Sequence, residues 1–247
     1  MTNRKNKKQP GCFPAGLPRG RGRKTKNRPG PFTGPGLSFP EGGKFYAENR
    51  MEGPTLLAPV PPALVSCGTL EAPNALAIAW TGILNSQPPK TYISVRPERY
   101  SYGLIKASGE FIINLPTAAL VRAVDYCGVR SGRSENKLAA ARLTPEAVPG
   151  FAAPAIAESP LCLACRVTDI VPLGTHDMFL ADIISVQVDE ELIDANGRLC
   201  LARAGLCAYA HGEYFALGRK IGSFGFSVKK KKKKPQGGRR PRQTEKG

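Results

Sequence analysis

The stretch AWTGILNSQPPKTYISVRPERYSY, residues 79–102, decides the fold because it joins two contrasting runs through a polar turn. An apolar run comes first, the turn NSQPP follows, and KTYISV then alternates between polar and apolar side chains. Alternation with a period of two is typical of a half-buried strand, whereas Asn and Pro are typical of turns. The stretch therefore predicts a strand after the turn, and its apolar first run is too short and too β-branched for a convincing helix.

The alternation also assigns side chains to the two faces of that strand, because successive side chains of a strand point to opposite sides. Ile93 and Val95 share the face that we expect to turn toward a core. Ser94 and Arg96 share the opposite face, which therefore presents a hydroxyl group and a guanidinium group.

A helix is expected directly after this strand, with Pro97 ending the strand and Ser101 placed as its N-cap. The free N–H groups at a helix start attract anions, and a guanidinium suits phosphate or carboxylate. Two interpretations remain open. Arg96, Ser101 and the helix start hold an anion together, or Arg96 is a solvated side chain beside an ordinary capped helix. The pattern alone favours the second.

A second loop and helix repeat this theme in YCGVRSGRSENKLAAARL, residues 126–143. Ser131 and Gly132 form a loop, Ser134 is placed to cap a helix, and Lys137 falls in the first helical turn. A cation there opposes the helix dipole, so a bound anion nearby would favour it. The alternative is an exposed lysine that destabilises the helix slightly.

The rest of the middle region favours a mainly β fold. Strand-like runs occupy residues 58–70, 111–116, 161–174, 176–194 and 211–218, and helical patterning is clear only at 100–110 and 134–143. Many short strands without a regular alternation of strand and helix indicate an antiparallel barrel or sandwich.

Charge divides the 247 residues into three parts. Residues 1–50 contain 12 Lys/Arg and 2 Asp/Glu, and residues 229–247 contain 10 Lys/Arg and 1 Asp/Glu, whereas the part between is nearly neutral. We expect both basic ends to be disordered, since they lack the apolar residues of a core. The predicted domain is 51–228. Basic ends bind phosphate backbones without sequence preference, which keeps a nucleic-acid-associated protein as an alternative.

The seven cysteines lie largely in apolar runs, which favours a reduced, cytoplasmic setting. Cys162 and Cys165 form a C-x-x-C motif, but residues three apart in a strand face opposite sides, so buried structural cysteines are expected there and no metal site.

No carboxylate pair stands out as an acid and base, and we expect no catalytic side chain. The sequence has no continuous apolar run of membrane-spanning length, so we expect no membrane partner.

Phosphate-binding signatures of nucleotide folds are also missing. The sequence contains no G-x-G-x-x-G after a strand and no Walker loop. If the protein uses a nicotinamide cofactor, it does not bind it with a Rossmann unit of its own.

Four segments taken in order resemble the flavin reductase-like, FMN-binding split-barrel family, in particular its flavoredoxin type. They are NALAIAWTGILNSQPPKTYISVRPERYSYGLIKASGEFIINLP, YCGVRSGRSENKL, PLGTHDMFLADI and EYFALGRKIGSFGFSV. The resemblance runs from about residue 54 to 228. It implies an antiparallel, Greek-key split β-barrel with a few short helices, assembled as a homodimer with FMN near the subunit interface.

The resemblance also implies which residues hold the cofactor. The phosphate would be held by Arg96, Ser101, Ser131 and Lys137, and Ser94 lies on the same strand face as Arg96. The flavin ring would lie along Ala79, Trp80, Thr81, Asn85 and Ser86, with Tyr102, Cys127 and His176 as candidates for the rim. The chain departs from many relatives at Leu138, where an aromatic residue often follows the lysine, and at Gln87 in the turn.

The function implied is that of an FMN-dependent oxidoreductase, a flavin reductase that takes a hydride from NAD(P)H and passes electrons to a small-molecule or protein acceptor. The flavin supplies the redox chemistry, and the protein orients and tunes it. A close alternative is an FMN electron carrier of the flavoredoxin kind, which receives its electrons from another protein.

Overall fold

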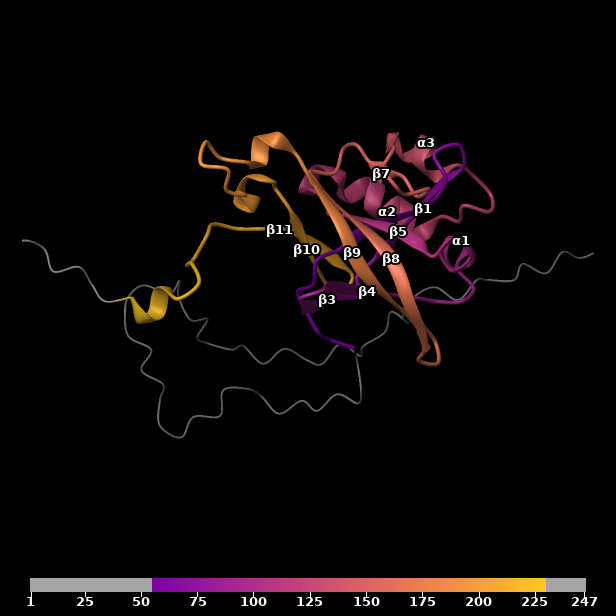
Figure 1. Cartoon of the computed structure of the whole chain (residues 1–247), viewed down its shortest axis with the longest axis horizontal. Helices are drawn as coiled ribbons and strands as arrows, with labels where there is room; N and C mark the ends of the chain where they lie inside the picture. The colour runs from indigo at the N-terminus through magenta and orange to yellow at the C-terminus, as the bar shows by residue number, and fades with distance from the viewer. Residues whose placement is uncertain (1–54, 230–247) are drawn as a thin grey trace, which may run out of the picture. The chain divides into compact units, whose positions relative to one another are not determined.

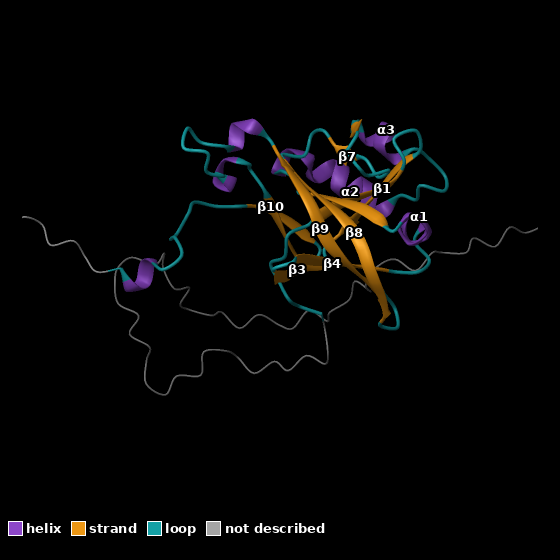
Figure 2. Cartoon of the chain, viewed as in Figure 1, coloured by secondary structure: helices purple, strands orange, loops and turns teal. Residues whose placement is uncertain are grey.

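The computed structural model describes residues 55–229 (Figure 1). The predicted disorder of residues 1–50 and of 229–247 lies outside the described residues, apart from Lys229. Within them the protein is mainly β with a few short helices (Figure 2), as the sequence predicts. No helix in the described range is long and apolar enough to cross a bilayer.

Seven strands form one sheet in the order β2-β1-β5-β8-β9-β4-β3, and every neighbouring pair is antiparallel. The strands are β1 (Ala63–Gly68), β2 (Pro73–Ile78), β3 (Thr81–Ser86), β4 (Pro89–Val95), β5 (Glu110–Asn114), β8 (Leu161–Pro172) and β9 (Asp177–Val188). Two small two-stranded sheets accompany it, β6 (Pro145–Glu146) with β7 (Ala155–Ile156) and β10 (Cys207–Ala210) with β11 (Glu213–Ala216).

The path of the chain explains why this sheet is a split barrel. Strands β2 and β3 are the two edges of the sheet, yet only Ala79 and Trp80 separate them along the chain. Two linking residues span about 10 Å at most. The sheet must therefore curl until its two edges approach each other, and residues 79–80 lie where the barrel remains open.

The apolar run 74–84 is thus two strands on opposite edges of the sheet. The predicted turn is confirmed, since Gln87 and Pro88 connect β3 to β4, although Asn85 and Ser86 still belong to β3. Strand β4 alternates as predicted, with Ile93 buried and Ser94 on the opposite, half-buried face.

Residues from six of the seven strands and one helix build the main core, including Ile93, Val95, Ile105, Phe111 and Phe179. Cys162 and Cys165 belong to different core clusters. The two side chains therefore face opposite sides of β8, as expected for residues three positions apart in a strand.

Three α-helices lie against this barrel, namely α1 (Tyr100–Ser108), α2 (Val121–Val129) and α3 (Lys137–Ala141). Single 3-10 turns occur at Ala118–Leu120, Glu190–Leu192, Leu201–Arg203 and Phe226–Val228. Helix α2 packs on β1 and β2 and shares a core cluster with α3 through Val124 and Leu138. The sequence predicts α1 and α3 but not α2, which places Cys127 inside a helix and not at the start of a loop.

Two predicted helix caps are wrong. Arg99, not Ser101, occupies the N-cap of α1, and Ser101 lies within the helix. Asn136, not Ser134, caps α3, where its side-chain oxygen accepts a hydrogen bond from the Ala139 N–H at 3.1 Å.

Candidate functional site

An aromatic pair marks one end of the candidate site. Trp80 lies in the link between β2 and β3 and is 42% exposed. The ring of His176, from the turn between β8 and β9, lies 4.1 Å from the Trp80 ring, centroid to centroid, and is tilted by 53°. Partial burial lowers the pKa of His176, and the charge of Arg96 lowers it further. Near neutral pH this pair is an uncharged, partly exposed surface on which a flat ring can stack.

Strand β3 continues from this pair along the sheet edge. The Thr81 hydroxyl donates to the Tyr92 carbonyl at 2.6 Å, and the Asn85 amide donates to the Pro88 carbonyl at 2.9 Å. Because β3 is an edge strand, alternate N–H and C=O groups face away from β4 and are free to bind a ligand. Ala79 and Thr81 lie at the Trp80 end, whereas Asn85 and Ser86 lie at the far end of the strand.

Arginines from two loops meet at the other end of the site. Arg96 is exposed and lies 3.7 Å from the Glu98 carboxylate. The Arg99 guanidinium donates to the Gly128 carbonyl at 3.2 Å, and that of Arg133 donates to the Glu98 carbonyl at 3.0 Å. The first bond ties the loop before α1 to the last turn of α2, and the second ties it to the loop before α3.

Lys137 lies beneath these loops and is only 4% exposed. Its ammonium group donates to the Cys127 carbonyl at 3.1 Å, and within residues 55–229 it forms no ion pair. Burial lowers the pKa of Lys137 from its ordinary value, and the nearby charge of Arg99 lowers it further. The alternative of an exposed lysine is therefore wrong. A buried cation without a counter-ion is costly unless an anion binds next to it.

A buried amide lies in the same cluster. Asn74, at the start of β2, donates to the Ser101 hydroxyl at 2.7 Å, while its own oxygen is buried without a hydrogen-bond partner in the described structure. The backbone of Gly132 passes so close that a Cβ atom there would lie 2.2 Å from this oxygen and 2.8 Å from the Tyr100 ring. Asn74 thus links the start of β2, helix α1 and the loop that carries Ser131.

The remaining predicted residues differ in their exposure to solvent. Ser131 is exposed, and its hydroxyl accepts from the Arg133 N–H at 3.3 Å. The Tyr102 hydroxyl donates to the Asp177 carboxylate at 2.7 Å, and this bond raises the pKa of Tyr102. The Cys127 thiol is buried in the core between α2 and α3, so this residue approaches the site through its carbonyl and not as part of a rim.

The two ends are neighbours. Arg96 and Arg99 both lower the pKa of His176, and Arg99 also lowers that of Lys137. The structure therefore brings Trp80, His176 and Arg96 together, and the charge of Arg99 acts on both His176 and Lys137. Asn85 and Ser86 lie apart from this group, at the hairpin turn.

Sequence reasoning missed Asn74, Arg99 and Arg133 as members of this region. Arg99 and Arg133 occur inside the quoted motifs RPERYSY and SGRSENK, so the motifs themselves point to them. An asparagine inside the otherwise apolar strand PNALAI is also unusual, because asparagine is depleted in strands.

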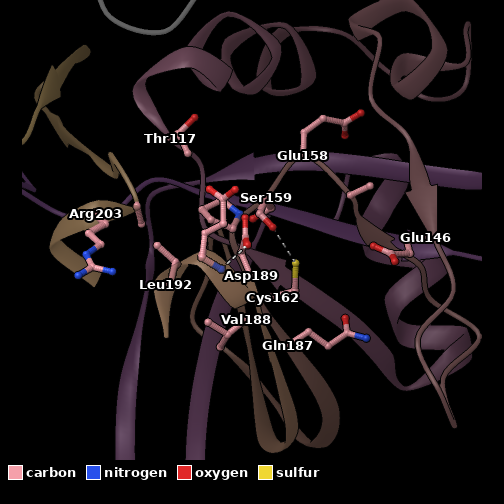
Figure 3. A pocket seen from close by; sticks show the side chains of 14 residues that line it. Thr117, Glu146, Glu158, Ser159, Cys162, Gln187, Val188, Asp189, Leu192 and Arg203 are labelled. Carbon is pink, nitrogen blue, oxygen red and sulfur yellow. Dashed lines mark hydrogen bonds between the residues drawn. The ribbon is translucent and has the colours of Figure 1, made fainter. Parts of the chain in front are cut away.

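Two cavities of the structure lie elsewhere. One, of about 490 Å³, lies beside β8 and β9 and contains the carboxylates of Glu146, Glu158, Asp189 and Glu191 against a single arginine, Arg203 (Figure 3). The other, of about 520 Å³, lies between α2 and α3. Neither includes a predicted cofactor-binding residue, and the acidic cavity would repel a phosphate.

Comparisons with known proteins agree with the fold described above. Residues 57–218 match the family model described as a flavin reductase like domain. The structure is similar to that of flavoredoxin of Desulfovibrio vulgaris (Miyazaki F), with 31% identity, a TM-score of 0.69, and coverage of 74% of this chain and 100% of that one.

Sequence relatives include an uncharacterized protein of Archaeoglobus fulgidus, 33% identical over 47% of this chain and 66% of that protein. An NADPH-flavin oxidoreductase of Streptomyces viridifaciens is 26% identical over 61% of this chain and 78% of its own length. Because the family model spans well over half of the sequence, and the flavoredoxin match covers that protein completely, this chain belongs to the flavin reductase-like domain family.

Proposed function

We propose that the chain binds FMN and acts as a flavin-dependent oxidoreductase. The observation that carries this proposal is Lys137, a buried ammonium group without a carboxylate partner in the described structure. A phosphate is a suitable counter-ion, and the positive charge of Arg99 lies close enough to lower the pKa of Lys137. The orphaned oxygen of Asn74 beside them also indicates that the cluster is complete only with a ligand.

Each end of the site would hold one part of the cofactor. Lys137, Arg96 and Ser131 would hold the phosphate, with Ser101 fixed beneath them by Asn74. The flavin ring would lie along β3 from Trp80 and Thr81, where edge backbone groups are free, and His176 would pack beside it. Ser94 lies on the half-buried face of β4, two residues before Arg96. Tyr102 lies at the edge of the site, where its hydroxyl group donates a hydrogen bond to the Asp177 carboxylate.

NAD(P)H is the proposed electron donor. A bound flavin accepts a hydride and passes on one or two electrons. The residues of the chain then have only to orient the ring, keep one of its faces open and hold the phosphate, so no acidic or basic side chain is required. The similarity to an NADPH-flavin oxidoreductase supports this donor.

A second candidate is an electron carrier that receives its electrons from another protein. The similarity to a flavoredoxin across that protein's whole length favours it. Oxidation of NADH and NADPH by the purified, FMN-loaded protein, followed at steady state with added free flavin, separates the two. Turnover with either nucleotide supports the reductase, and absence of turnover with both supports the carrier.

We also propose that the protein is a cytoplasmic homodimer. Strand β3 is an edge with exposed apolar side chains, and the ring end of the site lies on this open edge. A second copy that covers the edge would enclose the cofactor. Six cysteines of the described chain are free thiols, which is consistent with a reducing compartment.

The first experiment is the visible spectrum of the purified protein, followed by titration of the cofactor-free protein with FMN. Flavin absorbance, or uptake of one FMN per chain, is the expected result. A colourless protein that does not take up added FMN would contradict the proposal.

A further inference from the structure

Asp177 is a buried carboxylate at the start of β9. The residue is 9% exposed, and within residues 55–229 it forms no ion pair. Its Oδ2 accepts a hydrogen bond from the Tyr102 hydroxyl at 2.7 Å. Burying a carboxylate costs free energy, so an apolar pair would stabilise this contact more simply. What the polar pair adds is direction, because a hydrogen bond fixes the relative position of its two groups.

The ring of Tyr102 is held by the same strand. It packs against the main core and meets the ring of Phe179 edge-on, with 5.2 Å between the ring centroids. Phe179 and Asp177 are two residues apart in β9 and therefore share its buried face. The ring and the hydroxyl group of Tyr102 thus fasten helix α1 to the beginning of β9.

The turn between β8 and β9 (Figure 1) ends at this point of attachment. The turn is closed by the Leu173 N–H, which donates to the His176 carbonyl at 3.0 Å. His176 directly precedes Asp177, and its ring lies against Trp80 at 4.1 Å. A bond that fixes Asp177 therefore also fixes the backbone from which the His176 ring projects.

Helix α1 connects the same point to the other end of the candidate site. Tyr102 follows Ser101, whose hydroxyl accepts a hydrogen bond from the Asn74 amide at 2.7 Å. The contacts thus run from the beginning of β2 through α1 to β9, and from His176 back to Trp80, which lies just after the end of β2. The bond between the tyrosine and the carboxylate joins the two halves of this closed path.

We propose that Tyr102 and Asp177 are positioning residues for the flavin ring. Their bond holds the turn in the conformation in which His176 packs on Trp80, so the surface for the ring is formed before the cofactor binds. A preformed surface binds more tightly, because binding does not have to select a less populated conformation. The inference rests on the proposed FMN site, but the aromatic pair can also be measured in the cofactor-free protein.

The fluorescence of Trp80 reports directly on the aromatic pair, since it is the only tryptophan of the sequence. A protonated imidazole quenches an adjacent indole, so emission of the cofactor-free full chain should rise as pH increases through the lowered pKa of His176. The charges of Arg96, Glu98 and Arg99 act on this pKa and are present in every variant. The variant His176→Gln should abolish the titration, which identifies its source.

Tyr102→Phe removes the hydroxyl group and keeps the ring. We expect a smaller change in Trp80 emission across the titration, because the His176 ring then spends less time against the indole. The FMN dissociation constant should rise about three- to tenfold, since the competent conformation is less populated. Tyr126→Phe is the matched control. It removes a bond of the same kind and length, from Tyr126 to the Glu135 carboxylate on another helix, and should change neither property.

Two variants test the same bond from the carboxylate side. Asp177→Asn keeps an oxygen that accepts the Tyr102 hydrogen bond, so it should titrate and bind FMN as the parent does. Asp177→Val removes the acceptor with a residue that suits a strand, and it should behave like Tyr102→Phe. These variants also decide the question if Tyr102→Phe does not fold.

Three results would overturn the proposal. The first is a Tyr102→Phe variant that titrates and binds FMN like Tyr126→Phe. The second is a lower urea midpoint in Tyr102→Phe with unchanged Trp80 emission and FMN affinity, which would make the bond merely structural. The third is the absence of any difference between Asp177→Asn and Asp177→Val. A parent protein that binds no FMN would contradict the proposed function, whereas an altered Trp80 titration in Tyr102→Phe would still support the positioning of the aromatic pair.

Discussion

At the scale of single residues, the proposed FMN site depends most on the buried ammonium group of Lys137. We expect Lys137→Met to weaken FMN binding about 10- to 150-fold, because a hydrogen bond to a charged group contributes about 1.5–3 kcal/mol. Quenching of flavin fluorescence during titration measures the dissociation constant. Arg122→Met, which removes an exposed cation from helix α2, is the control and should bind FMN normally. Equal affinities in the two variants would remove Lys137 from the site.

The same substitution should stabilise the FMN-free protein. Burial lowers the pKa of Lys137 in the folded state, so below that pKa the folded protein carries a charge that the unfolded chain solvates better. Methionine fills the same space without the charge. Urea unfolding at neutral pH is expected to show a higher midpoint for Lys137→Met than for the parent. A lower midpoint would mean that the lysine stabilises the free protein.

FMN binding should depend on pH through the same ammonium group. The unfolded-state pKa of lysine is 10.5, and that of Lys137 in the free protein is lower. The phosphate binds the protonated form, so affinity should decrease as pH rises through the lowered pKa, and binding should take up protons there. Dissociation constants measured across the alkaline range, below pH 10.5, test this. In Lys137→Met the dependence should disappear, and a dependence that persists would assign it to another group.

At the scale of elements, the fit between β2 and the loop before α3 depends on one glycine. A Cβ atom at Gly132 would lie 2.2 Å from the Asn74 amide oxygen, so Gly132→Ala must displace either the loop or the buried Asn74 side chain. We expect a loss of about 1–3 kcal/mol in the free energy of unfolding, together with weaker FMN binding because Ser131 moves with the loop. Urea unfolding and FMN titration measure the two effects.

Gly103 provides the matched control for this prediction. It lies in α1, and a Cβ atom there would contact nothing within 4 Å. Gly103→Ala should stabilise the protein by about 0.5–1 kcal/mol, because alanine is the better helix former. If both alanine variants behaved alike, the close approach of Gly132 to Asn74 would have no energetic significance.

Local patterns predict the elements that depend on local physics. The two-residue alternation of β4 and the turn at Gln87–Pro88 follow from side-chain type and are confirmed. The role of Ser101 could not be predicted in this way. Its hydrogen-bond partner Asn74 is 27 residues away, and the bond exists only because the folded sheet brings β2 against α1. Lys137 is buried for the same reason, since α2 and the loops cover it only in the folded chain.

At the scale of the whole molecule, the opening in the barrel determines where the candidate site lies. The chain crosses from one sheet edge to the other at Ala79 and Trp80, so the end of the candidate site proposed for the flavin ring lies where the barrel does not close. The next hairpin returns the chain to Arg96, close to His176. The resemblance implied which residues hold the ring and which hold the phosphate. How the sheet curls to bring these two groups near each other follows only from the structure.

The open edge also leads to a prediction about assembly. Ile83 on β3 is 68% exposed on an edge strand, and Ile184 and Val186 of β9 are exposed as well. Exposed apolar edges promote association, so we expect light scattering to give the mass of a dimer. Ile83→Arg should shift the protein toward the monomer, because it places a charge in the contact. It should also lower FMN affinity, since the flavin ring would then lie on an uncovered edge.

Leu57→Arg introduces the same charge at another exposed aliphatic residue and should leave both the oligomeric state and the FMN affinity unchanged. A parent protein that is monomeric and still binds FMN with full affinity would show that one chain is sufficient to form the site.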